Sequence, residues 1–245
     1  MTNLKISKIR NKNSFICYGL LIAALIIVHF VIELWPDVEM LQNQKALFSW
    51  RAIGIVGLLG LVSVFLLNLS GLKQLWDEDV SIKNKIFIPI AAGLLLGLIQ
   101  SVYDMFTGAS SEIAASMGLG DIHIAFPFSI PIYFGGAIII SIIYYLIPIS
   151  ILVYLISTKI LKGKAESAVF WSVGIVIALF EPLTNPGLSV IQQVGIIAIP
   201  MSVSVLIFNL TTILFIRRYG FIAALFFCLG HYVIWHILFL FFSSF

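Results

Sequence analysis

A succession of apolar stretches constrains this chain more than any other feature, because each is long enough, or nearly so, to cross a lipid bilayer. A helix needs roughly 20 apolar residues to cross a hydrocarbon core of about 30 Å. Backbone polar groups in lipid must be satisfied within the segment, and the alternating pattern of a barrel is missing, so each stretch predicts a helix. The stretches lie near residues 15–35, 46–69, 86–106, 130–157, 168–183, 192–215 and 220–243.

The composition agrees with a membrane protein. Of the 245 residues, 61% are hydrophobic and only 10% are charged, and the mean hydropathy is +1.11. A soluble domain of this length has no use for so much apolar surface. We therefore predict an all-α, polytopic membrane bundle of about seven transmembrane helices.

The basic residues predict the orientation of the bundle, since Lys and Arg concentrate on the cytoplasmic side. With the N-terminus inside, only Lys45 and Arg51 of the 14 basic residues remain outside. We expect an N-in, C-out topology, with the first stretch kept as a signal anchor because its apolar run is too long for a secretory signal. The net charge of +3 needs no nucleic acid to explain it, because these cations lie where anionic headgroups attract them.

The fourth stretch contains a motif frame, GGAIIISIIYYLIP, at residues 135–148. It resembles the first motif of the CPBP family, the CAAX-prenyl-protease-like (Abi-like) and bacteriocin-processing membrane proteins, in which Glu-Glu-x-x-x-Arg lies inside a transmembrane helix. Ile140 and Ser141 occupy the places of the paired glutamates, and Tyr145 occupies the place of the arginine. The frame of the motif is kept without its ionisable groups.

Two later stretches carry frames similar to the other family signatures. The second signature, Phe-x-x-x-His, matches at Phe180, and its histidine place holds Thr184. The third follows a basic turn and Gly220, and its His and Asn/Asp places hold Cys228 and Tyr232.

A frame slipped by three residues would put His231 in the histidine place and Trp235 in the Asn/Asp place, with the wrong spacing from the glycine, so we prefer the unslipped frame. The resemblance covers roughly residues 130–240. It divides the chain into residues 1–129, a basic segment with three transmembrane helices, and residues 130–245, a CPBP-like core with four.

The resemblance implies an intramembrane endopeptidase family in which glutamate-activated water is assisted by two histidines and an amide or carboxylate. Losing one general acid or base typically costs ~10²–10⁴-fold in rate, and here every matched place is substituted. We therefore expect no catalytic residue, metal or cofactor at these places. The substituted positions are Ile140, Ser141, Tyr145, Thr184, Cys228 and Tyr232.

The function that the resemblance then implies is a non-catalytic pseudoprotease in the bacterial cytoplasmic membrane. It would bind a membrane-embedded or lipidated peptide or protein partner, in bacteriocin immunity or in the regulation of a membrane enzyme.

Four polar side chains within the predicted spans are candidates for lining the former cavity. Glu181 either lies at an outer helix end, facing water or pairing with Arg51, or faces the cavity. His231 and His236 point about 140° apart on a straight helix, so they do not share a metal site, and a histidine bonded to a neighbouring helix is more typical. Asn209 is expected to hydrogen-bond between helices.

Two further carboxylates, Asp104 and Glu33, lie near the ends of their predicted helices, where we expect them to reach water.

Two alternative functions remain open. The first is an active intramembrane protease with a displaced site, which requires Glu181 to reach His231. The second is a small transporter, although few polar residues lie along any helix and no pair of broken helices occupies corresponding halves.

Overall fold

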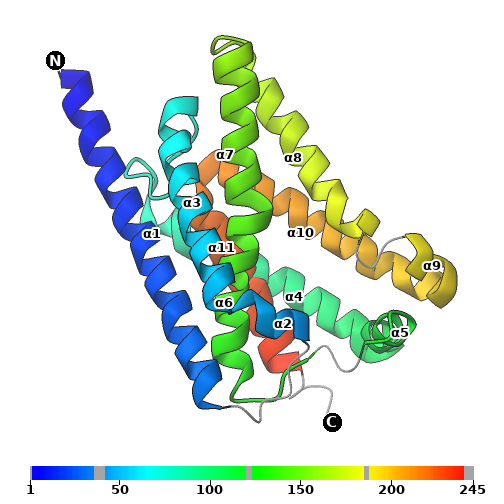
Figure 1. Cartoon of the computed structure of the whole chain (residues 1–245). Helices are drawn as coiled ribbons and strands as arrows, with labels where there is room; N and C mark the ends of the chain where they lie inside the picture. Colours follow the sequence, from blue (N-terminus) through cyan, green and yellow to red (C-terminus); the bar gives the residue numbers. More distant parts are fainter. Residues whose placement is uncertain (1, 36–41, 120–122, 185–187, 240–245) are drawn as a thin grey trace.

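The computed structural model describes residues 2–35, 42–119, 123–184 and 188–239, and these residues form helices joined by short connections, without a strand (Figure 1). In chain order the α-helices are α1 (Thr2–Leu34), α2 (Gln42–Leu47), α3 (Trp50–Ser70), α4 (Ile88–Thr107), α5 (Ala109–Ser116), α6 (Ser129–Ser141), α7 (Ile147–Val153), α8 (Glu166–Pro182), α9 (Leu188–Val194), α10 (Ala198–Tyr219) and α11 (Phe221–Tyr232). The π-helical segments are η1 (Lys83–Phe87), η2 (Ile142–Leu146), η3 (Tyr154–Ile160) and η6 (Val233–Leu238), and η5 (Gly195–Ile197) is a 3₁₀ turn.

Six helical segments of the described chain are long and apolar enough to cross a membrane: 12–34, 50–70, 83–107, 129–160, 189–219 and 221–238. They coincide with six of the seven predicted stretches, as expected for a multi-pass helical membrane protein. The remaining stretch, 168–183, forms α8, whose 17 residues extend about 25 Å at 1.5 Å per residue. The seventh span therefore stays a prediction.

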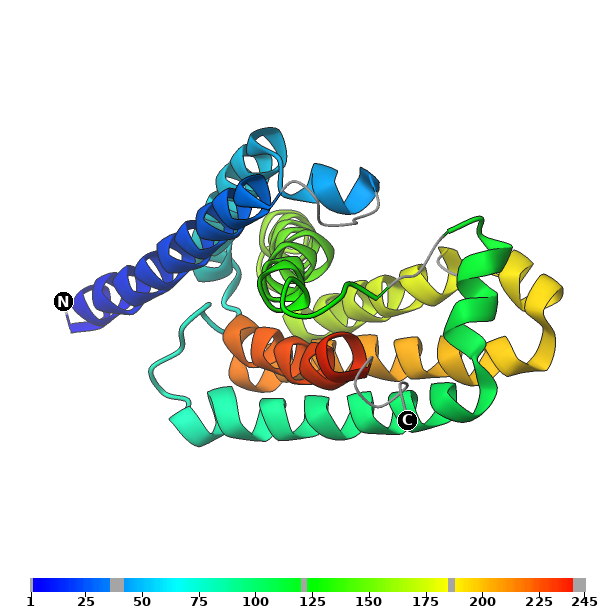
Figure 2. The same cartoon turned by 90° about the horizontal axis from the view of Figure 1, so that it is seen from below.

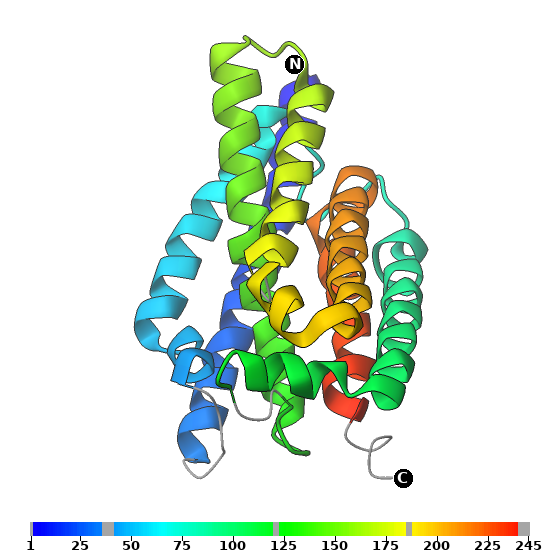
Figure 3. The same ribbon diagram turned by 90° about the vertical axis from the view of Figure 1, so that its right-hand side faces the viewer.

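A continuous helix from Ser129 to Ile160, made of α6, η2, α7 and η3, runs through the middle of the bundle (Figures 1 and 2). In the view of Figure 2, α1 and α3 lie on one side of this long helix, and α4, α10 and α11 lie on the other. Figure 3 shows the short helices α5 and α9 close together near one end of the bundle. The long helix thus contributes side chains to both halves of the packing.

Glycines bring the backbones of α4 and α11 into direct contact. A Cβ atom on Gly93 would lie 2.1 Å from the Phe227 carbonyl oxygen, and one on Gly97 would lie 2.8 Å from the His231 carbonyl oxygen. From the other helix, a Cβ atom on Gly230 would lie 2.4 Å from the Ile90 carbonyl oxygen. These backbones touch because no side chain separates them, as in other small-residue helix interfaces in membranes.

Polar contacts join further helix pairs. The Tyr18 hydroxyl of α1 donates to the Val56 carbonyl oxygen of α3 at 2.6 Å, lying in space that a side chain on Gly60 would fill. Near the start of α8, the Glu166 carboxylate accepts two bonds from the Arg217 guanidinium of α10, at 2.5 and 3.1 Å. The peripheral helices are therefore fixed by specific contacts as well as by apolar packing.

One expectation about a helix-end carboxylate is wrong. Asp104 does not reach water: it is 3% exposed. Its carboxylate accepts hydrogen bonds from the Ser110 backbone N–H at 2.6 Å and from the Ser110 hydroxyl at 2.5 Å. The chain reverses direction at Gly108, so the first turn of α5 covers Asp104. The Asp104 carboxylate then caps a free backbone N–H at the start of α5. Glu33, in contrast, has a side chain that is 68% exposed, as predicted.

Candidate functional site

Four helical segments bring polar side chains together in the interior of the bundle. Asn209 of α10 lies at the centre of this group and is 1% exposed. Its Oδ1 accepts a hydrogen bond from the Tyr145 hydroxyl at 2.5 Å, and its Nδ2 donates to Glu181 Oε2 at 3.1 Å. The same Nδ2 donates to the Ala178 carbonyl oxygen at 3.2 Å. One amide therefore ties the long helix, α8 and α10 together.

The group extends to α11 through a thiol. Cys228 is 1% exposed, and its sulfur lies beside the hydroxyls of Ser141 and Tyr232. Ser141 is also 1% exposed, and none of the described residues gives its hydroxyl a hydrogen-bond partner of normal geometry. Together with the residues bonded to Asn209, these side chains form what we call the central polar cluster: Ser141, Tyr145, Glu181, Asn209, Cys228 and Tyr232.

The central polar cluster contains four of the six substituted motif positions named above. Ser141, Tyr145, Cys228 and Tyr232 meet there, although they come from stretches far apart in the sequence. Thr184 does not join them, because it is exposed and its hydroxyl donates to the Phe180 carbonyl oxygen of its own helix at 2.7 Å. Ile140 is half-buried and apolar.

The central polar cluster lies beside the midpoint of the long helix. Tyr145 lies 16 residues after Ser129 and 15 residues before Ile160 in a helix of 32 residues. At about 1.5 Å per residue, each helix end is more than ~20 Å away. Glu181, bonded to Asn209 beside Tyr145, lies one residue before the end of α8. Among the described residues Arg51 is exposed and makes no ion pair with it.

The two candidate histidines have different surroundings. His231 Nε2 lies 3.0 Å from Gln100 Oε1, which also accepts a bond from the Ser204 hydroxyl at 2.9 Å. The His236 ring instead stacks on Tyr133, with ring centroids 4.3 Å apart. The spacing of the two residues on the helix predicted that their rings would not share a metal site.

The Gln100–Ser204–His231 contact was missed by the sequence reasoning. The available signal was Gln100 itself, a primary amide inside an apolar span, where an unpaired polar group is costly. A displaced catalytic site would require Glu181 to bond to His231. Within the described chain, these side chains belong to different hydrogen-bond networks.

The cluster consists of side chains that can form hydrogen bonds: a serine, two tyrosines, an amide, a thiol and a carboxylate. No group of three or more His, Cys, Asp or Glu side chains in the described ranges is placed to hold a metal ion. The Cys228 thiol lies beside the hydroxyls of Ser141 and Tyr232. Glu181 retains acceptor capacity, since a carboxylate has about four lone-pair sites.

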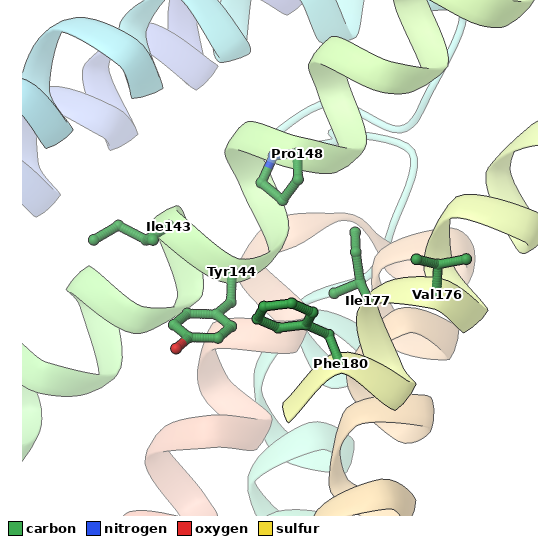
Figure 4. Close-up of a pocket in the computed structure, with 6 residues that line it drawn as sticks. All are labelled: Ile143, Tyr144, Pro148, Val176, Ile177 and Phe180. Atoms are coloured by element: carbon green, nitrogen blue, oxygen red, sulfur yellow. The ribbon is translucent and has the colours of Figure 1, made fainter. Parts of the chain in front are cut away.

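An apolar pocket of about 350 Å³ lies next to the cluster, between the long helix and α8. Figure 4 shows Tyr144 and Pro148 from the long helix and Ile177 and Phe180 from α8 lying between the two helices. We call it the lateral groove and define it by Ile143, Tyr144, Pro148, Val176, Ile177 and Phe180. Val176 and Phe180 are 67% and 57% exposed, so the groove opens at the outer surface of the bundle.

The groove and the cluster are adjacent along both helices. Tyr144 of the groove precedes Tyr145 of the cluster, and Phe180 precedes Glu181. The Tyr144 phenol lies within electrostatic range of the Glu181 carboxylate. An apolar surface and a polar anchor therefore lie side by side, the arrangement usual in small ligand sites.

Comparisons of the chain with protein-family models, with curated proteins and with solved structures found no match in any of the three.

Proposed function

We propose that this chain is a CPBP-like integral protein of the bacterial cytoplasmic membrane that binds a membrane-embedded or lipidated peptide partner without cleaving it. The observation that carries the proposal is the meeting of four motif-frame positions in one buried cluster beside the lateral groove. Such binding would serve either bacteriocin immunity or the regulation of a membrane enzyme.

The size and lining of the groove support a binding role. Its volume of about 350 Å³ is within the range of small-ligand pockets, roughly 300–1,000 Å³. It suits a few apolar side chains or part of a lipid chain. The cluster behind it offers hydrogen-bonding groups for orientation, and its six side chains include no histidine, the residue that assists hydrolysis in the family that the motif frames resemble.

We also propose seven membrane crossings, N-in and C-out, with α8 as the fifth crossing. The start of α1, the end of the long helix and the start of α8 lie at the same end of the bundle in Figure 1, which supports a common cytoplasmic face. A helix of 17 residues is a few ångströms short of the hydrocarbon thickness, a mismatch that local bilayer thinning accommodates at modest cost.

The proposal is tested with the purified full chain in lipid vesicles. The probes are a fluorescent Leu/Ala helix of about 20 residues and a farnesylated peptide, and energy transfer reports binding while mass spectrometry reports cleavage. We expect saturable binding of at least one probe, with both probes intact. Ile177→Trp, which fills the groove, should abolish that binding.

Leu58→Trp is the matched control, because Leu58 is 65% exposed on α3 and is not a groove residue. Cleavage of either probe would contradict the proposal, and so would binding that is equal in the wild type and in Ile177→Trp.

A further inference from the structure

Two histidine rings lie together at the end of the bundle where α6 begins. His123 precedes α6, and His236 belongs to η6 at the end of the last described helix. Their ring centroids are 5.7 Å apart, and their ring planes are inclined by 52°. The fold therefore brings two imidazoles together from segments that are far apart in the sequence.

Aromatic side chains hold both rings in place. Tyr133 of α6 stacks on His236, with ring centroids 4.3 Å apart and planes inclined by only 14°. The Tyr133 hydroxyl also accepts a hydrogen bond from the Ile124 backbone N–H at 3.0 Å, beside His123. Phe239 stacks on His123, with ring centroids 4.6 Å apart. Tyr133 therefore helps to position both histidines.

The surroundings of His236 leave one of its nitrogens for a ligand. Its Nδ1 is buried and makes no hydrogen bond with any described residue. A buried nitrogen without a partner is costly, and a ligand that bonds to it removes that cost. His123 needs only one nitrogen for a bond to a metal ion, because a ligating histidine normally uses its other nitrogen to bond a neighbour.

The separation of the rings fits one metal ion between them. A zinc or copper ion bound at about 2.0–2.1 Å to one nitrogen of each imidazole holds the two ring centroids roughly 5–6 Å apart. The observed 5.7 Å lies in this interval. Imidazole is a ligand for zinc and copper, whereas magnesium and calcium prefer oxygen. The ring chemistry and the spacing therefore select the same class of ion.

The surroundings also suit a cation that arrives from water. A metal-bound imidazole carries positive charge, and the Tyr133 face on which His236 stacks attracts it. His123 lies before the apolar span 129–160, so an ion reaches it without crossing the hydrocarbon. The described residues place no third His, Cys, Asp or Glu with this pair, which leaves coordination positions for water or for a group of a partner.

We infer that His123 and His236 form a binding site for one zinc or copper ion. The site goes beyond the proposed function, and it involves neither the residues of the lateral groove nor a motif-frame position as a ligand.

The test titrates the full chain, purified in detergent without a histidine tag, with Zn²⁺, Cu²⁺ or Mg²⁺ in a calorimeter. We expect one Zn²⁺ or Cu²⁺ to bind per chain and Mg²⁺ not to bind. His123→Phe and His236→Phe keep an aromatic ring and remove the nitrogens. Each should weaken binding at least about tenfold, because even a residue that only orients a ligand is typically worth 10–100-fold in metal affinity.

His29→Phe is the matched control, since the His29 ring bonds to the Phe48 carbonyl oxygen and is not part of the pair. It should bind the ion as the wild type does. Paramagnetic resonance of Cu²⁺ on the wild type gives a second measurement that does not depend on how the variants fold, and it should report two imidazole ligands.

Each outcome decides the inference. A wild type that binds neither Zn²⁺ nor Cu²⁺ overturns the site. Unchanged affinity in His123→Phe or His236→Phe removes that residue from the site and overturns the pair, as does a Cu²⁺ spectrum without two imidazoles. Equal binding of Mg²⁺ would show non-specific attraction of cations. None of these results affects peptide binding in the lateral groove, so the two proposals fail separately.

Discussion

Asn209 joins the parts of the central polar cluster. Its two amide atoms bond to Tyr145 and Glu181, which come from different helices. A single hydrogen bond in a membrane protein contributes only ~0.6 kcal/mol on average, because the alternative states in lipid also find partners. Asn209 matters more than this average suggests, since its removal takes hydrogen bonds away from two other interior side chains, Tyr145 and Glu181.

We expect Asn209→Ala to lower the free energy of unfolding by about 1–2 kcal/mol, because it removes three hydrogen bonds of ~0.6 kcal/mol each, to Tyr145, Glu181 and the Ala178 carbonyl oxygen. Unfolding in mixed micelles by SDS titration measures the change. Thr211→Ala, a half-buried neighbour on the same helix, should stay close to the wild type. An Asn209→Ala protein of unchanged stability would show that the cluster does not hold the helices together.

Among the helices, α4 and α11 depend most directly on having no side chain at their contact. Gly93 and Gly97 on one helix meet backbone atoms of the other, and Gly230 does the same in return. The crossing fixes the rotation of α4, and the same pair carries the Gln100–His231 contact. Packing at the glycines and pairing of these side chains therefore support the same helix register.

Gly93→Ala should destabilise the protein, because the added Cβ atom would lie 2.1 Å from the Phe227 carbonyl oxygen and the backbones would have to separate. Overpacking of this kind typically costs ~1–3 kcal/mol. Gly57→Ala is the matched control, since a Cβ atom there would meet nothing within 4 Å, and greater helix propensity favours it. Thermal denaturation in detergent compares the two, and equal transition temperatures would refute the close crossing.

At the scale of the whole molecule, the number of membrane crossings determines where the chain ends lie. An odd number puts the two ends on opposite sides of the membrane. α8 decides the number: six segments qualify by length and composition, and α8 is shorter than any of them. If α8 crosses, Glu166 and its partner Arg217 lie at the cytoplasmic face, as the distribution of basic residues predicts.

Reporter fusions test this topology. We expect alkaline phosphatase joined after residue 245 to be active, which marks an external C-terminus, and a fusion after Lys164 to be inactive. Green fluorescent protein at the same two positions should give the reverse pattern. An inactive phosphatase at the C-terminus would show that the chain crosses an even number of times.

Hydropathy predicts the spans well because it depends only on which residues enter lipid. Of the motif-frame positions, Ser141, Tyr145, Cys228 and Tyr232 meet in the structure, whereas Thr184 lies apart from them. The burial of Asp104 was not predictable in this way, because it depends on how α5 folds back after Gly108. The lateral groove likewise depends on the angle between two helices, which hydropathy does not determine.

The α4–α11 crossing also has a consequence for how the protein is made. Gln100 and His231 are 131 residues apart in the chain, and at about 5–20 residues per second the ribosome needs on the order of ten seconds to pass from one to the other. During that interval α4 is already in the membrane, with its glycine face and Gln100 without their final neighbours. The assembly of the bundle is therefore completed only when its last helix arrives.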